Sequence, residues 1–184
     1  MLYLIIKHIA EQINLTLSPG VVVPADVAKH ERPADAPGAD ELENHVLLSL
    51  INIEEENALK NNYPEQQIGA SRVTRPPALF LNLYLLFSAN FTKYDEALKH
   101  IGYVIRFFQA SKPFPIDDPD TEQRYKVTLT LHHIGFENLN NLWTVLGGKY
   151  LPSVLYKARL VMVQEGTPTG SQAIIDIQAS EHFN

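Results

Sequence analysis

Residues 78–88 have the sequence ALFLNLYLLFS, and both faces of this segment are apolar. In an extended chain, successive side chains point to opposite faces. One face holds only leucine and phenylalanine, at positions 79, 81, 83, 85 and 87. The other face holds Phe80, Asn82, Tyr84 and Leu86. A strand that is apolar on both faces is covered on both sides. We therefore predict that residues 78–88 form a central strand of a sheet.

Three other segments predict further strands of the same sheet. Residues 45–53 are apolar on both faces and end at the acidic run Glu54-Glu55-Glu56. Residues 125–132 alternate between apolar side chains and lysine, threonine or histidine, which is the pattern of a half-buried strand. Residues 152–164 predict the last strand. The sheet is therefore expected to have about four strands.

Three segments have apolar residues at spacings of three and four, which indicates amphipathic helices: 2–17, 92–109 and 136–146. In the third helix the expected apolar stripe consists of Phe136, Leu139, Trp143 and Leu146, and Trp143 is expected to pack in the core. Gly147-Gly148 closes this helix. The order of elements predicts an α/β (α+β) fold, with one mixed sheet and helices packed on it.

We expect one domain over residues 1–164, followed by a polar and partly disordered tail over residues 165–184. Residues 24–44 are acidic and rich in proline, and predict a long exposed loop. Residues 54–77, interrupted by two proline sites, predict a second one. Loops of this length are uncommon inside compact domains and are usually functional. Asp117-Asp118-Pro119-Asp120 predicts a third, acidic loop.

The composition excludes several classes of function. The chain has 184 residues and no cysteine, which excludes disulfides, thiolate metal sites and a cysteine nucleophile. A net charge of −6 disfavours general binding of nucleic acid. No apolar run approaches the length of a membrane-spanning helix. We therefore expect a protein that binds neither nucleic acid nor membrane.

The signals for catalysis are weak. Gly148-Lys149 lacks both the earlier glycine and the following Ser or Thr of a phosphate-binding loop. His132-His133 occupies adjacent strand positions, whose side chains point to opposite faces and do not easily share one metal ion. The aspartates at 117–120 lack the spacing of a calcium loop. A Ser-His-Asp triad stays open by residue count, but no G-x-S-x-G elbow is present. This pattern favours a structural protein over an enzyme, and indicates no cofactor or metal.

Three stretches of the sequence carry a family resemblance: Val46–Asn57, Pro77–Gln109 and Phe136–Val163. Two motifs within them are the most specific, NLYLLFSAN over Asn82–Asn90 and LWTVLGGKYLPS over Leu142–Ser153. With these motifs the chain resembles the tail-terminator or cap proteins of extracellular contractile injection systems. Those systems are phage-tail-like particles of the antifeeding-prophage and virulence-cassette type.

The resemblance implies a non-enzymatic α/β subunit related to phage tail terminators. It implies a homo-hexameric ring that caps the baseplate-distal end of the inner tube and sheath, stops polymerisation and fixes particle length. It also implies assembly in the bacterial cytoplasm, followed by release with the particle. Some relatives carry a C-terminal extension that is not expected here. Two alternatives stay open: another component of the same particle, such as a baseplate adaptor, or a ligand-binding or enzymatic α/β module.

Five residues are candidates for the interface of such a ring. Arg72 and Arg75 would pair with acidic groups on tube or sheath, or else serve only to solubilise a loop. Lys149, Tyr150 and Leu151 lie in the turn before the last strand, where they would enter an interface. Alternatively, this is a plain helix-to-strand turn with Tyr150 packed locally. The two long predicted loops, 24–44 and 54–77, are the expected arms that reach a neighbour.

Overall fold

The computed structural model describes residues 1–17, 20–25, 42–56, 66–68, 71–73, 80–110, 113–119, 123–146 and 150–163. These residues form a six-stranded mixed sheet in the order β1-β2-β5-β8-β7-β6, and a separate two-stranded sheet, β3-β4. The strands of the large sheet are β1 (Val22–Pro24), β2 (His45–Glu55), β5 (Phe80–Asn90), β6 (Phe114–Asp118), β7 (Gln123–Leu131) and β8 (Ser153–Val163). The small sheet consists of β3 (Gln66–Ile68) and β4 (Ser71–Val73). The three helices are α1 (Leu2–Thr16), α2 (Tyr94–Ala110) and α3 (Phe136–Leu146).

β5 lies inside the sheet, between β2 and β8, as its two apolar faces predict. It is antiparallel to both neighbours, and its pairing with β8 runs from Phe80 opposite Val161 to Ser88 opposite Ser153. Only β1 is parallel to its neighbour, so the sheet is mixed. The predicted fold class and the prediction of a central strand are therefore confirmed.

The expectation of about four strands in this sheet is too low, because two short edge strands are present. β1 has three residues and ends at Pro24, which is the first residue of the predicted loop 24–44. β6 contains Pro115, and its last two residues are the aspartates that the sequence indicated as a loop. Proline and charge are typical of edge strands, and such short strands form only where a neighbour supplies the pairing. Asp118 is buried, and its carboxylate lies 3.8 Å from the N-terminal amine of Met1.

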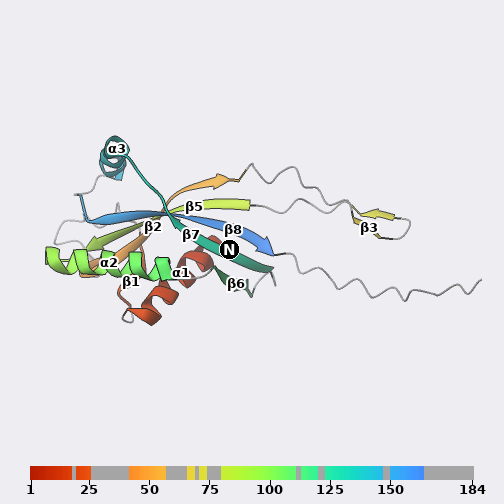
Figure 1. Cartoon of the computed structure of the whole chain (residues 1–184), viewed down its shortest axis with the longest axis horizontal. Helices are drawn as coiled ribbons and strands as arrows, with labels where there is room; N and C mark the ends of the chain where they lie inside the picture. The colour runs from red at the N-terminus through yellow and green to blue at the C-terminus, as the bar shows by residue number, and fades with distance from the viewer. Residues whose placement is uncertain are drawn as a thin grey trace, which may run out of the picture.

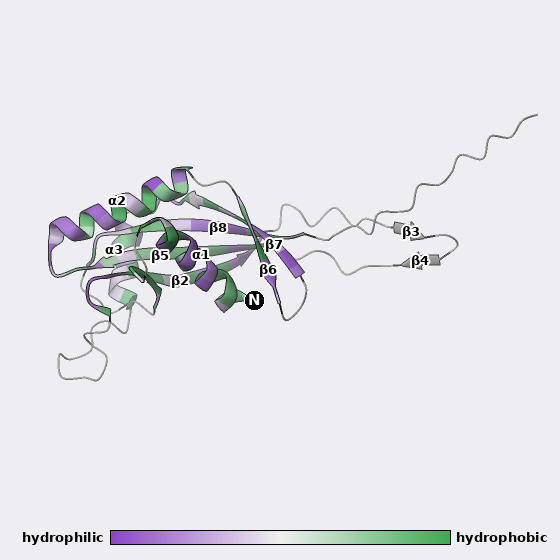
Figure 2. Ribbon diagram, turned by 90° about the horizontal axis from the view of Figure 1, so that it is seen from below, coloured by the Kyte–Doolittle hydropathy of each residue, from purple (hydrophilic) through white to green (hydrophobic). Residues whose placement is uncertain are grey.

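The first face of the sheet is covered by α1 and α2, which lie on the same side of it (Figure 1). In Figure 2 the α2 ribbon alternates between hydrophilic and hydrophobic colours, as an amphipathic helix does. Phe87 of β5 is completely buried at this face. Its ring centroid lies 5.5 Å from that of Phe108 of α2 and 5.8 Å from that of Tyr156 of β8. This core therefore joins the central strand to a helix and to the neighbouring strand.

The second face is covered by α3, on the opposite side of the sheet from α1 and α2 (Figure 1). Trp143 is 5% exposed and packs with Leu47, Leu86 and Leu155, which confirms the prediction that it lies in the core. The expected place of Phe136 in the same stripe is wrong, because its side chain is 91% exposed. The helix begins at Phe136, so this residue lies at the end of the helix.

Other predictions lie outside the described residues: the tail 165–184, most of the loop 24–44 and the Gly147-Gly148 turn. The loop predicted over 54–77 is wrong at its start, because β2 continues to Glu55, and β3 and β4 lie within it. No helix of the described chain is long and apolar enough to cross a lipid bilayer.

Candidate interaction surface

Beyond α3, the second face of the sheet carries polar side chains in two rows that cross the strands. In one row, Glu54 of β2 is opposite Asn82 of β5, and Asn82 is opposite Arg159 of β8. In the next row, Asn52 is opposite Tyr84, which is opposite Lys157 in turn. Residues directly opposite each other in antiparallel strands lie on the same face. We call this surface the polar rows, defined by Asn52, Glu54, Asn82, Tyr84, Lys157 and Arg159.

Asn82 ties the polar rows to the residue that follows β2. Its Nδ2 donates to Oε2 of Glu56 at 3.1 Å, and Arg159 Nη2 donates to the same oxygen at 3.3 Å. The Asn82 side chain is buried, and no described group donates a hydrogen bond to its Oδ1. Burying a polar atom without a partner costs stability, so the placement of Asn82 lowers the stability of the fold.

Glu54 lies near the end of β2, and its carboxylate accepts hydrogen bonds from two neutral groups. The Tyr84 hydroxyl donates to Glu54 Oε2 at 2.8 Å, and Asn52 Nδ2 donates to Oε1 at 3.2 Å. Because neither donor carries a charge, the negative charge of the carboxylate is not compensated by these bonds. The hydrogen bond to Glu54 raises the pKa of the Tyr84 phenol, and desolvation adds to this shift.

A groove of about 420 Å³ opens between this surface and α3. Its apolar walls come from Ile51 of β2, Leu142 and Val145 of α3, and Ile134 and Leu155. Its polar atoms come from Asn52, Glu54, Tyr84, His132, Asn138 and Asn141. An apolar channel with one carboxylate at its side fits a long side chain with an apolar stem and a cationic head.

The Glu54–Tyr84 contact gives a testable pH dependence. A phenol whose pKa is raised on folding stabilises the fold below its unfolded pKa, and this stability is lost as pH rises through the folded pKa. Glu54→Gln removes the carboxylate and is expected to lower the pKa of Tyr84 toward that of an ordinary phenol. The measurement is the ultraviolet titration of tyrosinate above neutral pH, with Tyr84→Phe to identify the transition of this residue. An identical titration of the wild type and Glu54→Gln would contradict the assignment.

The structure brings together only some of the residues predicted for an interface. Tyr150 is 64% exposed, and its ring centroid lies 5.8 Å from that of Trp143, so it packs locally and keeps an exposed surface. Leu151 is half-buried against the core beneath α3. Arg72 is the central residue of β4. Arg75 and Lys149 lie outside the described residues.

The polar rows were not predicted from the sequence as a site. In the sequence the acidic run at 54–56 marked only the end of a predicted strand, although Glu54 and Glu56 both bind side chains of β5. Asn82 and Tyr84 interrupt an otherwise apolar face of the predicted strand, and this interruption was the sequence feature that could have indicated the polar rows. Neither residue shows from sequence alone which strand lies beside it.

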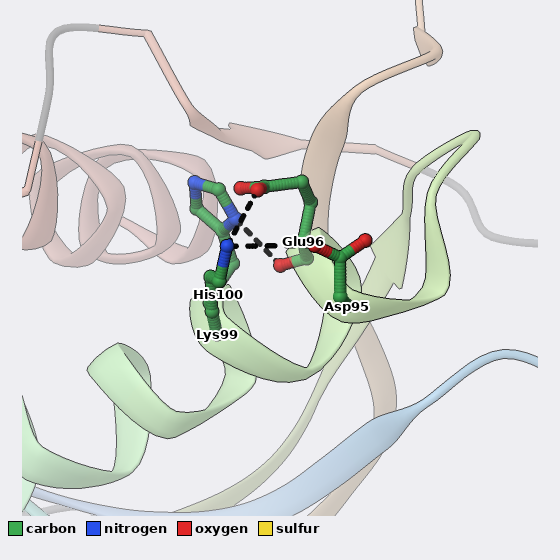
Figure 3. Close-up of polar contacts among 4 residues, drawn as sticks. All are labelled: Asp95, Glu96, Lys99 and His100. Carbon is green, nitrogen blue, oxygen red and sulfur yellow. Dashed lines mark hydrogen bonds and ion pairs between the residues drawn. The ribbon is translucent and has the colours of Figure 1, made fainter.

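Charged side chains on the outer face of α2 show a contrasting arrangement (Figure 3). Lys99 Nζ lies 2.8 Å from Oε1 of Glu96 and 3.5 Å from Oδ2 of Asp95, and all three side chains are well exposed. Exposed pairs of this kind contribute little to stability. His100 Nδ1 donates to the carbonyl oxygen of Glu96 at 2.8 Å, and the His100 ring stacks on Phe91 at a centroid distance of 4.3 Å. We regard this face as a solvated helix surface.

Within the described ranges, no three histidine, aspartate or glutamate side chains are placed to hold a metal ion together. The ring of His132 makes an edge contact with Tyr84, with centroids 5.0 Å apart. This histidine therefore belongs to the wall of the groove beside α3.

The fold is one found in terminator proteins of contractile injection systems. It resembles the sheath/tube terminator of the PVC extracellular contractile injection system in its extended state, with a TM-score of 0.57 and 13% identity over 100% of this chain and 64% of that chain. It also resembles the tube-terminating cap of the anti-feeding prophage, with a TM-score of 0.56 and 12% identity over 97% of this chain and 59% of that chain. The chain thus spans about three fifths of the length of these two proteins.

A sequence-family comparison defines the relationship more closely. The chain belongs to the Pvc16 N-terminal domain family, whose model matches residues 4–176. A search of curated proteins gives no significant sequence match. The family resemblance inferred from the motifs at Asn82–Asn90 and Leu142–Ser153 is therefore confirmed.

Proposed function

We propose that this protein forms a ring that caps the baseplate-distal end of the inner tube and sheath of a contractile injection system. The ring ends polymerisation and fixes the length of the particle. The observation that carries the proposal is the family match over residues 4–176. The shared fold with a sheath/tube terminator and a tube-terminating cap supports it. The role is structural, without catalysis, and the subunit is made in the bacterial cytoplasm and leaves with the particle.

The polar rows and the groove beside α3 suit such a role. A closed ring needs two different surfaces on each subunit that fit each other, because the contacts between neighbours are head to tail. Among the described residues, the sheet face beside α3 carries Glu54, whose carboxylate is bound by two neutral donors, and this face provides one surface. Tyr150 and Leu151 lie between the end of α3 and the start of β8. These two residues are proposed to contribute to the contacts with tube or sheath.

The proposal is tested by removing the protein from particles that are being assembled. Particles made without it are expected to have tubes and sheaths of variable length, because nothing stops the addition of subunits. Electron microscopy of many particles gives the length distribution, and expression of the wild-type chain in the same cells is expected to restore one length. A single, unchanged particle length in the absence of the protein would contradict the proposal.

The proposed ring also makes a prediction about mass in solution. Six chains of 20.7 kDa give a ring of about 124 kDa. We expect light scattering of the purified protein to show this species, in fractions that contain six-fold rings by negative-stain microscopy. A ring of another fixed mass would show that the number of subunits in the ring differs from six. A protein that is monomeric alone and also fails to bind tube ends would contradict the ring.

A further inference from the structure

The wall that α3 contributes to the groove is a stripe of exposed side chains. Asn138, Asn141 and Val145 all line the groove, and all three side chains are exposed. They recur at spacings of three and four, so they lie on one side of the helix. From residue 138 to residue 145 the stripe is about 10 Å long, at the rise of an α-helix. This length matches about three residues of an extended chain.

The two carboxamides of this stripe suit the main chain of an extended segment. A carboxamide carries both a donor and an acceptor, as each residue of a main chain does. Within the described chain, the side chains of Asn138 and Asn141 have no hydrogen-bond partner. Both carboxamides are therefore available to a segment that lies in the groove. A main chain in extended form presents its N–H and carbonyl groups at the side, where such carboxamides reach them.

The opposite wall of the groove determines the charge of the occupant. Its carboxylate, Glu54, is held in place by two neutral donors, and no described cation lies within ion-pair distance of it. Lys157 and Arg159, the cations of the polar rows, do not line the groove. A carboxylate in this position attracts lysine or arginine and repels a phosphate or another carboxylate. The apolar residues of the groove then cover the stem of the basic side chain.

The same chain carries basic side chains that are available to a neighbouring copy. Lys93 lies between β5 and α2, Lys126 lies in β7, and both are exposed. Among the described residues, neither of these two amines has a hydrogen-bond or ion-pair partner. A head-to-tail contact joins two different surfaces of one chain. This chain provides both kinds of surface, a groove with a carboxylate and exposed cations outside that groove.

We infer that the groove beside α3 binds an extended segment of a second copy of this chain. A lysine or arginine of that segment pairs with Glu54, and its main chain binds Asn138 and Asn141. The inference rests on the proposed function, because it identifies the contact between neighbours in the ring. About three residues of the segment lie in the groove, with the basic side chain in the middle. Recognition therefore depends on one charge and on main-chain hydrogen bonds.

Photo-cross-linking tests this contact without a prior choice of the segment. The full-length protein is made with the photoreactive residue p-benzoylphenylalanine in place of Val145, whose side chain lines the groove and is 85% exposed. Irradiation of the assembled protein, alone or on tube ends, is expected to give a covalent dimer on a denaturing gel. Mass spectrometry of the digested dimer is expected to place the link within about three residues of a lysine or arginine.

Matched variants separate this contact from random collision. The same photoreactive residue at Asn140, which is exposed but does not line the groove, lies about 140° around α3 from Val145 and is expected to give little dimer. In the chain labelled at Val145, Glu54→Gln is expected to lower the yield of dimer about tenfold, through loss of one charge-assisted pair. Asn138→Ala combined with Asn141→Ala is expected to lower it about fivefold, whereas Asn140→Ala leaves it unchanged. Circular dichroism checks that each variant is folded.

Three results would overturn the inference. A link that forms only within one chain shows that the groove is filled by its own chain. A dimer whose yield is the same with Glu54→Gln shows that this carboxylate does not recognise the segment. Rings that form without any dimer from the Val145 label show that the groove contact is wrong, while the ring stands. The failure of the proposed function gives a different result. A charge-dependent dimer in a protein whose removal leaves particle length unchanged keeps the groove contact and contradicts the capping role.

Discussion

Phe87→Ala is expected to lower the free energy of unfolding by about 3–5 kcal/mol. Phe87 is completely buried in the central strand, and its ring contacts those of Phe108 and Tyr156. Alanine removes these contacts and leaves a cavity that a sheet fixed on both sides cannot close. Because the side chain joins β5 to both β8 and α2, its removal is expected to destabilise the whole fold and not one element alone.

Urea unfolding followed by circular dichroism measures this effect. Tyr3→Ala is the matched control, since it removes an aromatic ring from α1 that is 73% exposed, and it is expected to change stability by less than about 0.5 kcal/mol. A loss of under about 1 kcal/mol for Phe87→Ala would contradict the placement of this ring in the main core.

Trp143→Ala is expected to cost a similar amount, about 3–5 kcal/mol, by detaching α3 from the sheet. Trp143 is the buried residue of this short helix, packed on Leu47, Leu86 and Leu155. Trp143→Phe is expected to cost far less. It keeps an aromatic ring, and it removes an indole N–H that is buried with no acceptor among the described groups.

The comparison of the two Trp143 variants separates packing from hydrogen bonding. Val145→Ala is the control on the same helix, because this side chain is 85% exposed, and it is expected to leave the unfolding midpoint nearly unchanged. If Trp143→Phe destabilised the protein as much as Trp143→Ala, the indole N–H would have to be satisfied in the native protein.

The long elements of this fold could be predicted from local pattern because burial imposes that pattern. β5 is covered on both faces and has apolar residues on both. α2 is covered on one side, and its apolar residues recur at helical spacing. β1 and β6 could not be predicted in this way. Three residues, or five that include a proline, carry too little pattern, and they become strands because a longer strand lies beside them.

The candidate interaction surface likewise depends on which strands lie side by side, and local sequence pattern does not show this. Asn82, Glu56 and Arg159 come from three separate segments and meet only through the register of the sheet. The family relationship, in contrast, was visible in the sequence, because the segments at Asn82–Asn90 and Leu142–Ser153 keep their motifs whatever surrounds them.

The pairing of β5 with β8 also determines when the molecule can fold. Phe80 lies opposite Val161, so the middle of the sheet joins residues from distant parts of the chain. Proteins dominated by such non-local pairings fold slowly, because a large loop must close before the contacts form. In a nascent chain, the side of β5 that pairs with β8 therefore stays unpaired until β8 has been synthesised. Only chains translated through Val163 can complete the sheet, and a prematurely terminated product is left with an exposed, aggregation-prone strand for the cell's chaperones and proteases to remove.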